Sequence, residues 1–242
     1  MPNIPGLEVM QTSLVISCPI VLLVEGKDEI HFFAALFRHM GPENNIKLIE
    51  INSYRSKQYI VKNMNTGANI VELREVGGKE RLHIDFPAFL LDPGFYQVKA
   101  YAIIQDADSS ATNTLRSVQK ILKDNNQPCP NAHSTFVLNN DNTLKVGVFI
   151  MPGTSTGMLE NLCLSSVKDH PIMPHVSYFM KRVKETMGDK GPKNESKATV
   201  QAFLSGMPDP ITSVGTAAQK HCWPFDDGVF DNLRSFLEQL SQ

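Results

Sequence analysis

The sequence predicts an α/β fold in which a parallel sheet is flanked by helices. Between residues 20 and 164, short apolar runs alternate with segments of helical periodicity, as in strands joined by crossover helices. Some runs are apolar throughout, which is typical of strands buried on both faces. The chain of 242 residues can form one large core, or a core with an insertion.

The first unit is a strand, a tight turn and a helix. Residues 20–24 read IVLLV, and Glu25-Gly26 ends this strand. From residue 27 onward, Ile30, Phe33 and Phe37 recur at helical spacing until a Gly-Pro pair at 41–42 stops the helix.

The rest of the chain divides into a core and a helical extension. Further strands are predicted at 46–51, 70–76, 98–105 and 145–151, and helices at 80–91, 114–122 and 158–164. Asp108 or Ser109 is the expected cap of the helix at 114–122. The polar stretch 52–69 leaves an insertion open. Residues 165–242 predict helices at 176–187, 197–204 and 229–240, so we expect an α/β core over 1–164 and a helical extension over 165–242 packed on it.

Composition excludes several classes of protein. The first 19 residues do not have the pattern of a signal peptide, and no run reaches the roughly 18 to 20 apolar residues of a membrane span. The four cysteines are scattered without a CxxC pair, so neither a disulfide framework nor a zinc ribbon is predicted. We therefore expect a cytoplasmic protein without a membrane partner. The net charge of -2 gives no general argument for nucleic-acid binding, so such a partner would have to be held locally.

Acidic residues follow three predicted strands. Glu25 follows the first, Asp106 and Asp108 follow a later one, and Glu160 begins the helix after the strand at 145–151. Ligands of α/β sheets collect at the carboxyl ends of strands. Gly26 lets the backbone turn beside Glu25.

Glu29 lies one helical turn after Glu25 and could face the same space, with Asp28 as its competitor. Asp106 and Asp108 project together only if the chain stays extended through Ala107. Clustered carboxylates bind a cation or take up protons, and oxygen ligands without His or Cys favour Mg²⁺ or Mn²⁺. Such a site suits phosphoryl transfer.

These motifs resemble those of Toprim domains, in which a Glu after the first strand and an Asp-x-Asp after a later one bind Mg²⁺. Residues 23–29, LVEGKDE, are especially similar to the first motif of the overcoming-lysogenisation-defect nucleases. The resemblance implies a Toprim-like, Rossmann-like fold and a metal site at Glu25, Glu29, Asp106, Asp108 and Glu160. In that branch a downstream lysine lies near the scissile phosphate, and Lys197 is the weak match here, with a solvated helix start as the competing interpretation.

Two functional hypotheses follow. The first is a Mg²⁺- or Mn²⁺-dependent nuclease, with Glu25 and Lys197 as catalytic residues and DNA favoured over RNA. The second is a non-catalytic metal- or nucleic-acid-binding module that works with a separate ATPase, a partner implied by the resemblance alone. Lys181, Arg182 and Lys184 could hold the nucleic-acid backbone, although a solvated helix face explains them equally simply. Association into an oligomer is left open.

Overall fold

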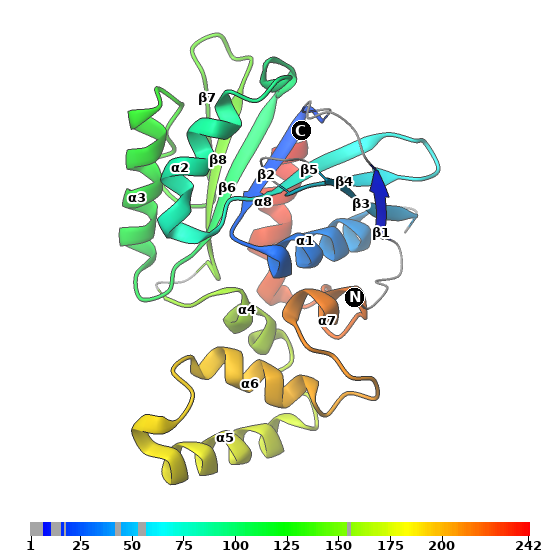
Figure 1. The fold of residues 1–242 in the computed structure, drawn as a ribbon, viewed down its shortest axis with the longest axis vertical. Helices are drawn as coiled ribbons and strands as arrows, with labels where there is room; N and C mark the ends of the chain where they lie inside the picture. Colours follow the sequence, from blue (N-terminus) through cyan, green and yellow to red (C-terminus); the bar gives the residue numbers. More distant parts are fainter. Residues whose placement is uncertain (1–6, 11–15, 17, 42–44, 53–56, 154–155) are drawn as a thin grey trace.

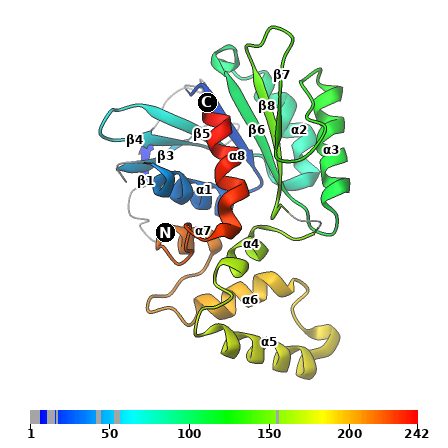
Figure 2. The ribbon, with the colours of Figure 1, turned by 180° about the vertical axis from the view of Figure 1, so that it is seen from behind.

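The computed structural model describes residues 7–10, 16, 18–41, 45–52, 57–153 and 156–242. Over these residues the protein has the predicted α/β, Rossmann-like architecture, with one sheet between two layers of helices (Figures 1 and 2). The strands described are β1 Leu7–Met10, β2 Ile20–Val24, β3 Ile46–Asn52, β4 Lys57–Asn63, β5 Asn69–Glu75, β6 Ala100–Asp106, β7 Thr135–Leu138 and β8 Lys145–Met151, in the order β1-β3-β4-β5-β2-β6-β8-β7.

The helices cover both faces of the sheet, and their bounds differ from the predictions mainly at the ends. They are α1 Lys27–Met40, α2 Gly78–Leu90, α3 Ala111–Asp124, α4 Leu159–Ser166, α5 Met173–Met187, α6 Glu195–Leu204, α7 Val214–Gln219 and α8 Asp231–Ser241, with short 3-10 turns at Phe95–Gln97, Gly188–Lys190 and Gly228–Phe230.

Strand β2 shows why its sequence is apolar throughout. Leu22 and Val24 lie in the core formed with α1, α4 and α8, whereas Val21 and Leu23 lie in the core formed with α2 and α3. All four side chains are fully buried. A strand buried on both faces needs apolar residues at every position, so the prediction of a central strand is confirmed.

The sheet is mixed rather than purely parallel. Strands β5, β2, β6 and β8 are parallel neighbours, but β4 runs antiparallel between β3 and β5, and β7 pairs antiparallel with β8. The stretch 52–69, for which an insertion was left open, thus contributes β4 to the sheet, while residues 53–56 lie outside the described part. Most of the first 19 residues, which bear on the signal-peptide prediction, also lie outside it.

The helices after residue 165 are arranged in two groups. Helix α7 packs on α1, and α8 packs on β6 and β8. Helices α5 and α6 pack on each other beyond the carboxyl edge of the sheet, where α4 contacts α6 (Figure 1). No helix within the described residues is long and apolar enough to cross a membrane.

Candidate metal centre

Four parallel strands bring the predicted acidic residues to one edge. Because β2 lies between β5 and β6, and β8 lies beside β6, the carboxyl ends of these strands are neighbours. Glu25 leaves β2, Asp106 ends β6, and the chain after β8 leads to Glu160 on α4. The strand order thus gathers residues that are up to 135 positions apart, counted from Glu25 to Glu160.

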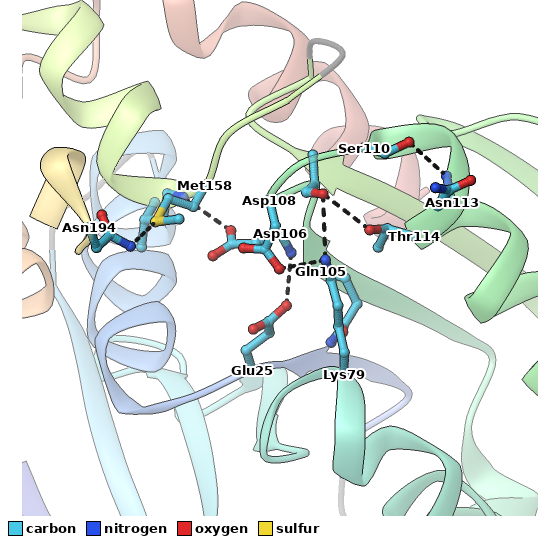
Figure 3. A network of polar contacts seen from close by, with 12 residues as sticks. Glu25, Lys79, Gln105, Asp106, Asp108, Ser110, Asn113, Thr114, Met158 and Asn194 are labelled. Carbon is cyan, nitrogen blue, oxygen red and sulfur yellow. Dashed lines mark hydrogen bonds and ion pairs between the residues drawn. The ribbon is translucent and has the colours of Figure 1, made fainter. Parts of the chain in front are cut away.

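Asp106 lies at the centre of this edge and is held by backbone groups (Figure 3). Its side chain is buried, with 8% of its surface exposed. Its Oδ1 accepts a hydrogen bond of 3.0 Å from the backbone N–H of Leu159, the first residue of α4. Its own backbone N–H donates to Glu25 Oε1 at 2.9 Å. Glu25 and Asp106 are therefore fixed to each other through one backbone group.

Asp108 has a different environment. The backbone N–H of Ala107 still bonds to the carbonyl oxygen of Met151, and the chain turns at Asp108, which adopts a left-handed conformation with φ of 50°. Its backbone pairs with Gly157, with N–H to oxygen distances of 2.7 and 2.8 Å. The side chain is half exposed and forms a 2.6 Å ion pair with Lys79. The expected cap of α3 was wrong, since Ser110 caps it by accepting from the N–H of Asn113.

The competition between Asp28 and Glu29 is resolved by their surroundings. Asp28 Oδ1 accepts a 3.2 Å hydrogen bond from the N–H of Gly215 at the start of α7. Glu29 Oε2 instead lies over the turn, 3.3 Å from where a Cβ on Gly26 would be. Glu29 is thus the member of the pair that faces the acidic cluster, and Gly26 leaves room for it.

Glu160 and Lys197 approach each other across α4 and α6. Lys197 Nζ lies 3.7 Å from Glu160 Oε1. Asn161 Nδ2 donates to Ser196 Oγ at 2.9 Å, and Asn194 caps α6 by accepting from the N–H of Lys197. No sequence pattern predicts these hydrogen bonds between the starts of α4 and α6, which place the predicted lysine beside the predicted glutamate.

Burial and mutual repulsion raise the pKa values of the cluster. Burial first, and then the charges of Glu25, Glu29 and Glu160, raise the pKa of Asp106 to about 9. Burial first, and then the charges of Glu25, Asp28 and Glu160, raise the pKa of Glu29 to about 7. Burial is also the main cause that raises the pKa values of Glu25 and Glu160, and hydrogen bonds from backbone N–H groups, followed by nearby lysines, partly offset it. The ionised forms of these carboxyl groups are therefore disfavoured, by burial first and then by their mutual repulsion.

The donor chemistry fits a hard divalent cation, but the side chains are engaged elsewhere. The acidic groups described at this edge offer carboxylate oxygens, which suit Mg²⁺ or Mn²⁺. Within the described part of the chain, no three His, Cys, Asp or Glu side chains converge into a group that could hold a metal ion as they stand. Glu25 and Asp106 each accept a backbone N–H on one carboxylate oxygen, which leaves the other oxygen for an ion, whereas Asp108 is paired with Lys79 and would have to exchange that partner.

The predicted backbone-holding residues lie apart from the cluster. Lys181, Arg182 and Lys184 are exposed on α5, on the far side of α6 from the sheet (Figures 1 and 2). The first two face Glu185 at 3.9 and 2.7 Å, and Lys184 faces Glu195 at 3.4 Å. The structure therefore does not bring these three side chains together with the acidic site.

Lys79 is the charged residue of this edge that the sequence did not reveal. It follows Gly77-Gly78, where β5 leads into α2, and both glycines have positive φ values of 63° and 70°. Its signal in the sequence was the Gly-Gly-Lys directly after a predicted strand. This pattern places Lys79 near the acidic residues only because β5 lies beside β2, and the sequence pattern does not reveal that strand order.

The comparisons identify a family without assigning an activity. The family described as "Protein of unknown function (DUF3226)" matches residues 19–242, and the chain belongs to this family. No curated protein and no solved structure matches the chain.

Proposed function

We propose that this member of the DUF3226 family carries out Mg²⁺-dependent phosphodiester cleavage on nucleic acid, in the manner of the Toprim nucleases that its sequence resembles. One observation carries the proposal. Glu25, Glu29, Asp106 and Glu160 lie within electrostatic reach of one another at the carboxyl edge of the sheet, where burial and repulsion raise their pKa values. Carboxyl groups whose pKa values are raised in this way by burial and by neighbouring charges are typical of functional sites.

Each carboxylate has a role that follows from its surroundings. Glu25, Asp106 and Asp108 are the residues that would hold Mg²⁺ or Mn²⁺, with Glu29 and Glu160 completing the oxygen-rich wall. When bound, the ion supplies polarisation of a phosphate oxygen and stabilises developing negative charge. Asp106, with a pKa of about 9, holds a proton at neutral pH and must release it to become a ligand.

The cations of the site suit a phosphate. Lys79 and Lys197 lie on the two sides of the cluster, beside Asp108 and Glu160. Lys197 is 63% exposed, so its ammonium group is accessible to a phosphate, although its partner Glu160 is buried. We assign Lys197 the catalytic role of stabilising the phosphate oxygens. Glu25 is the second catalytic residue, as a ligand of the metal ion. Because the whole chain has a charge of -2, local groups of this kind must provide the attraction for DNA, the favoured substrate.

The test is a cleavage assay on single- and double-stranded DNA and RNA with Mg²⁺ or Mn²⁺. We expect the wild type to cut and the double variant Asp106→Asn, Asp108→Asn to lose at least about a hundredfold in rate, since each carboxylate contributes to charge stabilisation. Asp189→Asn, in the 3-10 turn after α5, is the matched control and should cut normally. A wild type that fails to cut any of these polymers, or a double variant that still cuts, would refute the proposal.

A specific observation also favours the second candidate, a binding module that acts with a separate ATPase. The carboxylates are engaged by N–H groups and by Lys79 and do not converge into a ready ion site. A module that binds nucleic acid without cutting it would show affinity that falls with salt but no turnover. Recovery of an ATPase with the purified protein from its native cells would support this alternative, whereas recovery without one would count against it.

A further inference from the structure

The turn between β5 and α2 places Lys79 at the carboxyl edge of the sheet. Gly77 and Gly78 turn the chain sharply after β5, which lies directly beside β2. A Cβ on Gly78 would lie 3.8 Å from Glu25 Oε2, so the turn runs against the central carboxylate. Lys79, the next residue, consequently projects across the carboxyl edge of the sheet toward the loop after β6.

Its ammonium group has one strong partner there. Nζ lies 2.6 Å from Asp108 Oδ2 and 3.5 Å from the carbonyl oxygen of Ala107 (Figure 3). The Lys79 charge also acts on Glu25, where it lowers the pKa against the larger effect of burial. The lysine therefore touches one of the acidic residues and influences the second.

The Lys79–Asp108 ion pair can exchange its partners readily. The exposed fractions of the two side chains are 32% and 50%, so water competes for both groups. Exposed ion pairs of this kind contribute little to stability. Asp108 is also the acidic residue of the cluster that is half exposed, whereas Asp106 is buried and bound by the N–H of Leu159. The pair thus lies on the open side of the cluster, where a substrate would arrive.

We propose that Lys79 contacts a phosphate of the substrate, that it is paired with Asp108 when no metal ion is bound, and that a divalent cation and Lys79 compete for the Asp108 carboxylate. This inference rests on the proposed function. If Asp108 held the ion, Lys79 would lose its partner and its Nζ would be free to contact a phosphate of the substrate. The same side chain is therefore a competitor of the metal and a ligand of the substrate.

This double role separates Lys79 from a lysine that only supports the fold. Loss of a supporting lysine would weaken metal binding and substrate binding together. Loss of the proposed competitor removes a positive charge and a bound partner from the ion site, so metal binding should become tighter, on the order of three- to tenfold. Binding of nucleic acid in the presence of metal should become weaker.

The experiment measures Mn²⁺ binding to the full chain from the electron paramagnetic resonance signal of free Mn²⁺. Nucleic-acid binding is measured separately by fluorescence anisotropy with Ca²⁺, an ion chosen to limit cleavage. We expect Lys79→Met to bind Mn²⁺ three- to tenfold more tightly than the wild type and to bind a DNA oligonucleotide several-fold more weakly. Lys79→Arg, which keeps the charge, should stay close to the wild type in both assays. Lys120→Met, which removes one exposed charge from α3, should change neither affinity.

A double-mutant cycle with Asp108→Asn isolates the competition. In the Asp108→Asn background, Lys79→Met should no longer tighten Mn²⁺ binding by the same factor, because the contested carboxylate is gone. Circular dichroism of each variant verifies folding, and Lys79→Arg keeps the test usable if Lys79→Met does not fold. Mn²⁺ affinity that is unchanged or weaker in folded Lys79→Met overturns the inference alone. A wild type that binds no Mn²⁺ instead overturns the metal site of the proposed function.

Discussion

The substitution Glu29→Gln should stabilise the protein at alkaline pH, although it removes a residue of the proposed site. The pKa of Glu29 is raised from 4.5 to about 7, by burial first and then by the charges of Glu25, Asp28 and Glu160. A glutamine has nearly the same shape and carries no charge. Above pH 7 the variant therefore avoids the unfavourable ionisation that the wild type must accept on folding.

The sign and the size follow from proton linkage. A carboxyl group whose pKa is higher in the folded state binds more protons folded than unfolded, so its contribution to stability is complete below about pH 4.5 and is lost as the pH rises through 7. The difference of about 2.5 in pKa corresponds to at most about 3.5 kcal/mol, at roughly 1.4 kcal/mol for each pKa unit. Asp106, with a pKa of about 9, extends the same downward trend to higher pH.

The assay is urea unfolding in EDTA at several pH values between 5 and 8.5, comparing the wild type with Glu29→Gln. The variant should gain stability relative to the wild type as the pH rises, by on the order of 1 to 3 kcal/mol at pH 8. Glu238→Gln, which removes an exposed charge on α8, should follow the wild type. Taking the difference between variants cancels groups such as His31, whose pKa burial lowers. A Glu29→Gln protein that is less stable than the wild type at pH 8 would refute the reasoning.

Three further predictions test the framework around the site by urea unfolding and Mn²⁺ binding. Asp28→Ala should lower the free energy of unfolding by about 1 to 2 kcal/mol, because Asp28 accepts a hydrogen bond from the N–H of Gly215. Its Mn²⁺ affinity should change less than twofold. A large loss of Mn²⁺ affinity would place Asp28 in the metal site. Gly157→Ala should cost about 2 kcal/mol or more, since φ is 116° and the new Cβ would lie 3.1 Å from neighbouring atoms; an unchanged midpoint would contradict this. Asn161→Ala removes the hydrogen bond to Ser196 and should lower the free energy of unfolding by about 1 kcal/mol. If α6 positions Lys197, the rate of cleavage should also fall severalfold. An unchanged cleavage rate would argue against that role of α6.

The sequence was most informative where a strand is buried on both faces. Strands β2 and β8 are apolar over almost their full length, and their predicted bounds agree with the structure to the residue at 20–24 and 145–151. Strands β1 and β7 were missed. Each has only four residues and lies at an edge of the sheet, where one side needs no partner strand and the apolar pattern is correspondingly weak.

Helix α7 was missed for a different physical reason. Its six residues, VGTAAQ, have no long apolar stripe and are too few to form a stable helix alone. Gly215 lets its backbone approach α1 closely, since a Cβ there would lie 2.8 Å from the carbonyl oxygen of Asp28 and from Cβ of His31. The Trp223 side chain adds a 3.0 Å hydrogen bond to the Val214 carbonyl oxygen. Tertiary contacts of this kind leave no local periodicity to detect.

The same distinction between local pattern and strand order explains the candidate site. That Glu25, Asp106 and Asp108 follow strands is a local property, and it predicted their common edge. That Lys79 faces Asp108 depends on β5 lying beside β2, which periodicity does not encode.

The strand order also sets how charge is distributed along the carboxyl edge. From β5 through β2 and β6 to α4 and α6, the edge presents Lys79, then Glu25 with Asp106 and Asp108, then Glu160 and Lys197. The two lysines thus pair with Asp108 and Glu160, and neither pairs with Asp106. A cation held by Asp106 would therefore not have to displace a lysine from that carboxylate. Because the two lysines pair with different acids, their contributions to substrate binding should be separate, and substituting both should weaken nucleic-acid binding more than either substitution alone.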